Sequence, residues 1–347
     1  MRTGVLLPWL GFLACAAAIA FAGVRLSRYG EQIARLSGTG RTWVGLVLLA
    51  TVTSLPELVA GLSSVTVAQA PDLAVGDALG SCVFNLGILV VVDVFHRQTS
   101  FYTRIRQGHV LSAGLGIVLL GVVAFDILLH QLGSPLDFAG NGLTSPLVIL
   151  VYIVGIRILF RYEMSPANRE REPEEATEAA PLTLRQASWA YARWSLVILA
   201  AGTALPLVGE VVALVMHWDQ SFFGTLFMAF ATSLPEMVVT IAAVRQGSPD
   251  LAVGNLFGSN LFNMVVLALD DLAWTRGSLL ASVSPVHAVS AVSAMIMTGV
   301  AIVALIYRPQ GRLFRVVGWT SLALFGLYLA NGYLLFLFSA RHVSPAP

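Results

Sequence analysis

Runs of about twenty apolar residues fill most of this chain and limit what it can fold into. Ten such windows lie near residues 5–34, 42–69, 72–95, 109–130, 143–161, 190–217, 221–245, 250–272, 284–307 and 313–339. A helix of about twenty apolar residues is long enough to cross the hydrocarbon core of a bilayer. Because the backbone must satisfy its own hydrogen bonds in lipid, we predict that all ten windows are helices. The expected fold class is all-α, a polytopic membrane protein with ten transmembrane helices.

Composition narrows the classes of function. Hydrophobic residues make up 57% of the 347 residues and charged residues only 11%, against about 25% charged in an average soluble domain. A large soluble catalytic domain has no room here, so we expect neither an enzyme nor a cofactor. The net charge of +1 gives no electrostatic reason to expect nucleic acid. The lipid bilayer is the expected surrounding, and no obligatory protein partner is evident. Cys15 and Cys82 lie in apolar runs, which predicts neither a disulfide framework nor a cysteine metal site.

One long polar stretch, from Tyr162 to Arg185, divides the chain into two halves. Its glutamates are interleaved with arginines, as expected of a solvated linker. We predict a first five-helix unit over residues 1–162, a linker over 163–188 and a second five-helix unit over 189–347.

The placement of arginine predicts the topology. All twenty basic residues are arginine, and all but Arg2, Arg276 and Arg341 lie in or beside alternate loops that include the linker. Cytoplasmic loops carry an excess of basic residues. We therefore expect a multi-pass protein of the cell (inner) membrane, with both termini outside and the linker in the cytoplasm.

The two halves also repeat each other. A shift of 179 residues superposes Thr53-Ser54-Leu55-Pro56-Glu57 on Thr232-Ser233-Leu234-Pro235-Glu236. A shift of 178 superposes residues 71–76 on 249–254, and then Gly80-Ser81 and Phe84-Asn85 on Gly258-Ser259 and Phe262-Asn263. Because each unit holds an odd number of spans, the second copy enters the membrane from the opposite side. Inverted repeats of this kind are typical of secondary transporters, whose binding sites lie near the midplane.

Each repeat places a glutamate, Glu57 or Glu236, inside an apolar span. An ionisable group there costs at least about 2.5 kcal/mol, so it is a functional candidate. Pro56 and Pro235 precede these glutamates and interrupt the helical hydrogen-bond ladder, which frees carbonyl groups beside each carboxylate. The plain alternatives are a glutamate neutralised by protonation and a proline kink that serves only packing.

The following span of each repeat adds further oxygen atoms. Two sets of polar residues each share one helix face: Asp77, Ser81 and Asn85, and Asn255, Ser259 and Asn263. GxxxG pairs on a neighbouring face allow another helix to come close. For the serines and asparagines, a role as interhelical glue is the alternative. Carboxylates, hydroxyls, amides and carbonyls, without cysteine or histidine, suit hard cations such as Ca²⁺ and Na⁺. Two carboxylates balance one divalent charge, although ligand type alone leaves Mg²⁺ open.

These residues carry a family resemblance. Two copies of T-S-L-P-E, each followed by P-D-L-A-V-G and G-S-x-x-F-N, resemble the alpha repeats of the cation/calcium antiporter superfamily, and within it the sodium/calcium exchangers. The motif regions lie at about 45–93 and about 224–271. The resemblance implies two inverted five-helix repeats around a central four-helix core of spans 2, 3, 7 and 8. Long tilted spans 1 and 6 would slide across that core for alternating access.

The resemblance also implies a set of ligands. Carried over position by position, Glu57 and Glu236 would be the main ligands of Ca²⁺ and Na⁺. The others would be the carbonyls of Ala50, Thr53, Ala229 and Thr232, the hydroxyls of Ser54, Ser233, Ser81 and Ser259, and the amides of Asn85 and Asn263. Sodium and calcium would compete for overlapping positions, which couples their movements in opposite directions.

Three features depart from the family pattern. The glycine that usually precedes T-S is Val52 and Ala231 here, which affects packing but no ligand atom. Asn263 stands where potassium-dependent relatives usually carry aspartate, which argues against potassium dependence and leaves two core carboxylates. Asp77 breaks the symmetry with Asn255, and it either attracts cations into the outer vestibule or is merely solvated.

The expected function is secondary-active antiport in which the Na⁺ gradient drives Ca²⁺ extrusion. A Ca²⁺/H⁺ antiporter on the same fold is the alternative, although proton-coupled relatives resemble G-N-A-x-E rather than T-S-L-P-E. The remote alternative is an intramembrane enzyme, such as an aspartyl protease that uses Asp77. That reaction would need a second aspartate at matching depth, and none is evident in the sequence.

Overall fold

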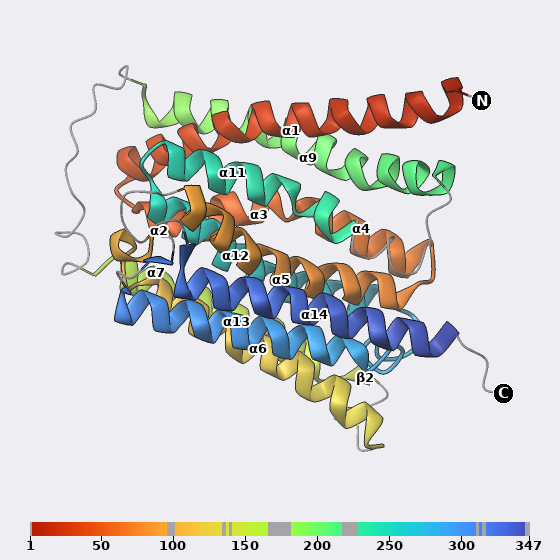
Figure 1. Ribbon diagram of the computed structural model, residues 1–347. Helices are drawn as coiled ribbons and strands as arrows, with labels where there is room; N and C mark the ends of the chain where they lie inside the picture. The colour runs from red at the N-terminus through yellow and green to blue at the C-terminus, as the bar shows by residue number, and fades with distance from the viewer. Residues whose placement is uncertain are drawn as a thin grey trace.

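The computed structural model describes residues 2–95, 101–133, 137–138, 141–165, 182–216, 228–309, 312–313 and 317–343. Within these ranges the chain forms a bundle of long helices (Figure 1). The first half contains α1 (Arg2–Ser37), α2 (Arg41–Trp43), the π-helix η1 (Val44–Leu49), α3 (Ala50–Thr53), α4 (Leu55–Thr66), α5 (Pro71–Phe95), the 3-10 turn η2 (Phe101–Arg104), α6 (His109–Gln131), β1 (Asp137–Phe138), β2 (Asn141–Gly142) and α7 (Thr144–Glu163).

The second half repeats this order of long helices. It contains α9 (Leu184–Val215), α11 (Leu234–Arg245), α12 (Pro249–Ala273), α13 (Val286–Tyr307), β3 (Arg312–Leu313), β4 (Val317–Gly318) and α14 (Trp319–Val343). Residues 228–232, which precede α11, are also helical. Two short antiparallel ribbons pair β1 with β2 and β3 with β4.

Most of the predicted spans are present as helices. Eight helices of the described ranges are long and apolar enough to cross a membrane, and the pair Arg41–Thr53 and Leu55–Thr66, bent by 40°, gives up to nine. The predicted span 221–245 begins outside the described ranges and is helical from residue 228. The mainly helical, multi-pass fold is therefore confirmed, whereas the count of ten spans and the division into two inverted repeats stay predictions.

Helix α9 begins at Leu184, inside the stretch predicted to be a linker, of which residues 166–181 lie outside the described ranges. A capping box starts the helix: the backbone N–H of Gln186 donates to the Thr183 hydroxyl, and the backbone N–H of Thr183 donates to the Gln186 side chain. These two bonds satisfy backbone donors that the first helical turn leaves free.

The long helices run in alternating directions along the bundle (Figure 1). Helix α1 begins and α14 ends at one end, which we call the terminal end, and there α4 also ends and α5 begins. Helix α7 ends and α9 begins at the opposite end, which we call the linker end. Both ends of the described chain therefore lie on one side, and the predicted linker joins helices on the other.

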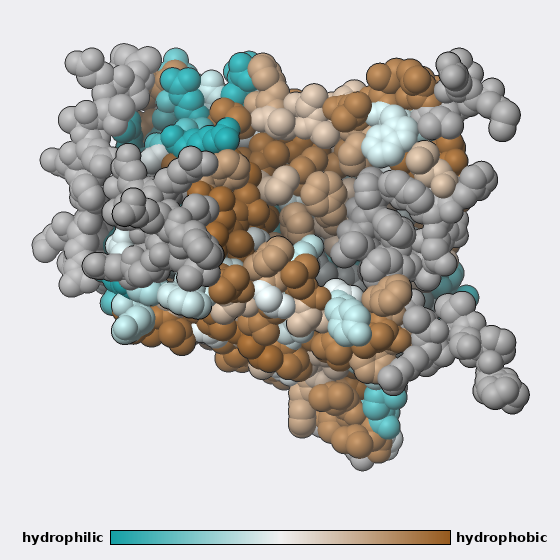
Figure 2. Space-filling model, in the orientation of Figure 1, coloured by the Kyte–Doolittle hydropathy of each residue, from teal (hydrophilic) through white to brown (hydrophobic). Residues whose placement is uncertain are grey.

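The surface of the bundle is apolar over much of its length. Large hydrophobic side chains point outward from several helices, among them Leu7 with 74% of its surface exposed and Phe125 with 58%. In Figure 2, brown residues cover much of the visible middle of the molecule, while teal residues gather at the linker end. An exposed apolar belt of this kind suits lipid as the surrounding medium.

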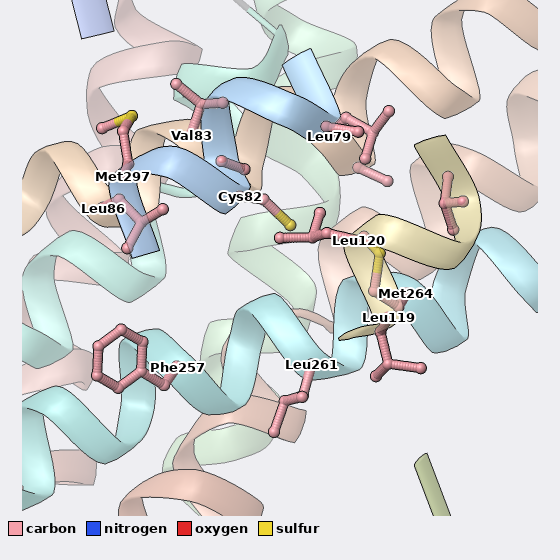
Figure 3. Packing of buried hydrophobic residues seen from close by; sticks show 14 of the residues in the cluster. Leu79, Cys82, Val83, Leu86, Leu119, Leu120, Phe257, Leu261, Met264 and Met297 are labelled. Carbon is pink, nitrogen blue, oxygen red and sulfur yellow. The ribbon is translucent and has the colours of Figure 1, made fainter. Parts of the chain in front are cut away.

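Helix α12 lies at the centre. In the most apolar stretch of α12, 89% is buried inside the protein, compared with 17% for α14. Helix α12 packs against α5, α4, α11 and η1. Figure 3 shows how apolar side chains of α5, α6, α12 and α13 point toward one another in the core, among them Leu86, Leu119, Leu261 and Met297. Helices α1 and α9 pack together along one side of the bundle, and α1 also contacts α11.

Glycines allow α12 to approach the broken span closely. A Cβ on Gly254 would lie 2.8 Å from the Thr42 carbonyl oxygen, and one on Gly258 would meet the Leu46 carbonyl oxygen and the Ala50 Cβ. Only glycine leaves room for backbone at these distances. The predicted role of this GxxxG pair in close helix packing is therefore confirmed.

Candidate functional site

Two helix breaks place the repeated glutamates. Ser54 separates α3 from α4 with φ −92° and ψ 6°, and Ser233 precedes α11 with φ −85° and ψ 6°. Pro56 and Pro235 lie in the first turns that follow, where a missing N–H is tolerated. Each glutamate therefore lies in the first turn of a helix, where backbone N–H groups and the helix dipole stabilise negative charge.

The broken helices exchange hydrogen bonds across the two halves. The Ser54 hydroxyl donates to Glu236 Oε1 over 2.8 Å, and the Ser233 hydroxyl to Glu57 Oε1 over 3.2 Å. Each repeat thus supplies the serine that holds the other repeat's carboxylate. All four side chains are buried, with at most 1% of their surface exposed.

Two serines from the neighbouring helices extend these contacts. Ser81 of α5 shares a 2.8 Å hydrogen bond with the Ser233 hydroxyl, and Ser259 of α12 donates to Glu236 Oε1 over 3.2 Å. The contacts therefore form two hydrogen-bonded sets of predicted site residues, one around each glutamate.

Four buried oxygen atoms of the predicted ligands have no hydrogen-bond partner among the described residues. They are Glu57 Oε2, Glu236 Oε2, Asn85 Oδ1 and Asn263 Oδ1. An unsatisfied buried acceptor costs about 1–3 kcal/mol, and more when it is charged. Such a cost is offset when the atoms bind a cation, and carboxylate and amide oxygens are the ligands that Ca²⁺ takes in proteins. These oxygen atoms therefore fit a hard cation as the transported substrate.

The threonines lie one position before each break. The Thr53 hydroxyl donates to the carbonyls of Leu49 and Ala50, and the Thr232 hydroxyl to those of Met228 and Ala229. The carbonyls of Ala50 and Ala229 also accept the backbone N–H groups of the two break serines. Ala50 and Thr53 therefore belong to the last helical turn before the first break, and Ala229 and Thr232 to the last turn before the second.

Asp77 is not solvated, so that interpretation of the sequence is wrong. Only 5% of its surface is exposed, and its Oδ1 accepts a 2.9 Å hydrogen bond from the Thr232 hydroxyl. The equivalent contact in the other half joins Thr53 to Asn255 Oδ1 over 3.2 Å. A carboxylate on one side and an amide on the other therefore make this pair of contacts electrostatically unequal.

The sequence interpretation missed two residues at the crossing of α5 and α12. Asn85 donates to Asn260 Oδ1 over 3.1 Å, and Asn263 contacts the Cys82 thiol over 3.9 Å. Asn260 and Cys82 are related by the same shift of 178 residues, and Cys82 lies among apolar side chains in Figure 3. A cysteine therefore adjoins the site. Asn260 lies within the repeated segment of α12, between Ser259 and Asn263, and that position could have marked it as a residue near the site.

Buried oxygen ligands at helix breaks, inside a multi-pass bundle with an apolar surface, define a class of protein, the secondary transporters. The model of the family described as "Sodium/calcium exchanger protein" matches residues 7–161 and 188–334. The chain belongs to this sodium/calcium exchanger family, and it is therefore a membrane antiporter and not an enzyme.

Individual relatives agree with this assignment. Sodium/calcium exchanger MaX1 of Methanosarcina acetivorans is 25% identical over 333 residues, covering 88% of this chain and 92% of the relative. Inner membrane protein YrbG of Escherichia coli is 24% identical over 275 residues, covering 74% and 80%. A solved structure of the sodium-calcium exchanger NCX_Mj covers 94% of this chain and 97% of its own, at 20% identity and a TM-score of 0.70. That likeness shows a shared fold.

Proposed function

We propose that this protein exports Ca²⁺ in exchange for Na⁺ by alternating access. One observation carries the proposal: the two buried carboxylates, Glu57 and Glu236, each have one oxygen held by a serine hydroxyl and one with no hydrogen-bond partner among the described residues. Two carboxylates balance the charge of one Ca²⁺, so the ion can leave water without leaving net charge in a medium of low dielectric constant.

The ligands in this proposal are the two glutamates together with the residues that surround them. The hydroxyls of Ser54, Ser233, Ser81 and Ser259, the amide oxygens of Asn85 and Asn263, and the carbonyls of Ala50, Thr53, Ala229 and Thr232 complete the set. Na⁺ takes oxygen ligands as well, so the two ions compete for overlapping positions. The names of MaX1 and NCX_Mj, which both denote exchange of sodium for calcium, support this choice.

The orientation is part of the same proposal. The arginine-rich loops lie on the side of the linker, so we place the linker end in the cytoplasm and the terminal end outside, in the cell (inner) membrane. The two inverted five-helix units would then present α1 and α9 as the pair that slides across the core.

Transport in liposomes tests the coupling ion. We expect an imposed Na⁺ gradient at fixed pH to drive ⁴⁵Ca²⁺ across the membrane in the direction opposite to Na⁺. A pH gradient in the absence of Na⁺ should drive no ⁴⁵Ca²⁺ transport. If only the pH gradient drives Ca²⁺, the protein is a Ca²⁺/H⁺ antiporter and Na⁺ coupling is wrong.

The exchanged serine bonds make a second prediction. A hydrogen bond to a charged group contributes about 1.5–3 kcal/mol, so Ser54→Ala and Ser233→Ala should each raise the KM for Ca²⁺ about tenfold or more. Ser165→Ala is the matched control, because that hydroxyl binds only the Tyr162 carbonyl at an exposed helix end. An unchanged KM in both site variants would show that these serines do not position the carboxylates.

A further inference from the structure

Another buried carboxylate, Asp270 in the last turns of α12, lies outside the site described so far. None of its surface is exposed, and neither carboxylate oxygen has a hydrogen-bond partner among the described residues. The next residue, Asp271, differs: it accepts hydrogen bonds from the Ser145 hydroxyl and from the Leu279 N–H. Asp271 therefore holds the following loop, whereas no structural role explains the burial of Asp270.

The chain makes room for this carboxylate on α4. A Cβ on Gly61 would collide with both oxygens of Asp270, so the bare backbone of α4 faces the acid directly. Gly61 is four residues after Glu57 and Asp270 is seven after Asn263, so each lies on the face of its helix that carries the site residue. At 1.5 Å per residue, the displacement along the helices is about 6 Å on α4 and about 10 Å on α12.

A further acid, Asp77 of α5, adjoins the central site, where its Oδ1 accepts a hydrogen bond from the Thr232 hydroxyl. Electrostatic coupling links Asp77 to both Glu57 and Asp270. Helix α4 ends and α5 begins at the terminal end, so the three acids lead from the centre toward that end. The row has no equivalent toward the linker end, since the repeat places Asn255 at the position of Asp77 and Val92 at that of Asp270.

We propose that Asp270 binds a Na⁺ ion on its way between the terminal end and the central site. This inference rests on the proposed function. A single carboxylate balances one monovalent charge but only half of the charge on Ca²⁺.

A binding measurement tests the proposal without transport. In the Glu57→Gln/Glu236→Gln double variant, whose central carboxylates are removed, replacing choline chloride with NaCl should still raise the melting temperature, because an ion that binds only the folded state stabilises it. Adding Asp270→Asn should abolish this Na⁺-dependent rise, and adding Asp271→Asn should preserve it. A rise that survives Asp270→Asn, or none in the double variant, would overturn the proposal.

Sided kinetics give a second readout if the double variant does not fold. In liposomes of defined orientation, Asp270→Asn should raise the half-saturating Na⁺ concentration about 3- to 10-fold on the terminal-end side only. The value on the linker-end side and the half-saturating Ca²⁺ concentration should change less than about twofold. Equal changes on both sides, or a lower maximal rate alone, would mean that Asp270 has only a structural role. Failure of wild-type Na⁺ coupling would instead show as Ca²⁺ flux driven only by a pH gradient.

Discussion

Glu57→Gln and Glu236→Gln are each expected to abolish exchange, with a loss of Ca²⁺ transport of at least about 100-fold. Each glutamate has one oxygen held by a serine of the opposite repeat and one without a hydrogen-bond partner among the described residues. Glutamine keeps the shape and an acceptor but removes the charge. Bound Ca²⁺ would then carry an uncompensated charge in a buried site, which costs several kcal/mol.

The measurement is ⁴⁵Ca²⁺ uptake into liposomes at equal protein density, with folding checked by size-exclusion chromatography. Glu210→Gln is the matched control, because Glu210 occupies the second repeat, is exposed on α9 and should tolerate the same change. Full activity in either site variant would remove that glutamate from the cation site and leave the proposed function without its main support.

The repeat was the strongest predictor of the site. The equivalence of Thr53–Glu57 and Thr232–Glu236 predicts a helix interruption beside each carboxylate, and in the structure each carboxylate accepts a hydrogen bond from a serine hydroxyl. What the sequence could not show is that the serines cross over, each to the other repeat's glutamate. That exchange depends on the packing of α11 against α3, which are far apart in the chain.

Asp270 shows where interpretation by hydropathy fails. The pair Asp270-Asp271 stands at the end of an apolar window, where acids normally reach water, so neither residue was singled out. In the structure Asp271 does hold a loop, whereas Asp270 faces inward opposite Gly61. The same rule failed for Asp77, which lies near the beginning of its span and is nevertheless buried.

Hydropathy also misplaced the starts of two spans. The last one was predicted from residue 313, but β3 and β4 lie there and α14 begins at Trp319. The other has a clear physical cause. Hydropathy predicted a helical span from residue 190, but α9 begins at Leu184, where the Thr183 capping box starts the helix in a polar segment. Capping depends on a few side-chain hydrogen bonds and not on apolar content, so a window that counts apolar residues cannot detect it. Spans such as α6 and α13, whose apolar windows coincide with the helices, were predicted to within a few residues.

The second large effect is expected at Gly258, where α12 crosses the broken span. Gly258→Ala should destabilise the protein by about 2–3 kcal/mol, because the added methyl group would meet the Leu46 carbonyl oxygen and the Ala50 Cβ, and a well-packed core tolerates little extra volume. The backbone around Ala50 would have to move, and Ala50 lies one turn before Ser54. Transport should therefore fall together with the melting temperature.

Gly299→Ala is the matched control for this substitution. Gly299 lies in the interior of α13, and a Cβ there would meet nothing within 4 Å. Since alanine favours helix by about 0.8–1 kcal/mol over glycine, this variant should match or exceed the wild-type melting temperature in the same detergent. If Gly258→Ala behaves like Gly299→Ala, the close approach of α12 to the broken span does not stabilise the fold. In that case the glycine pair would be no more than a tolerated feature of the repeat.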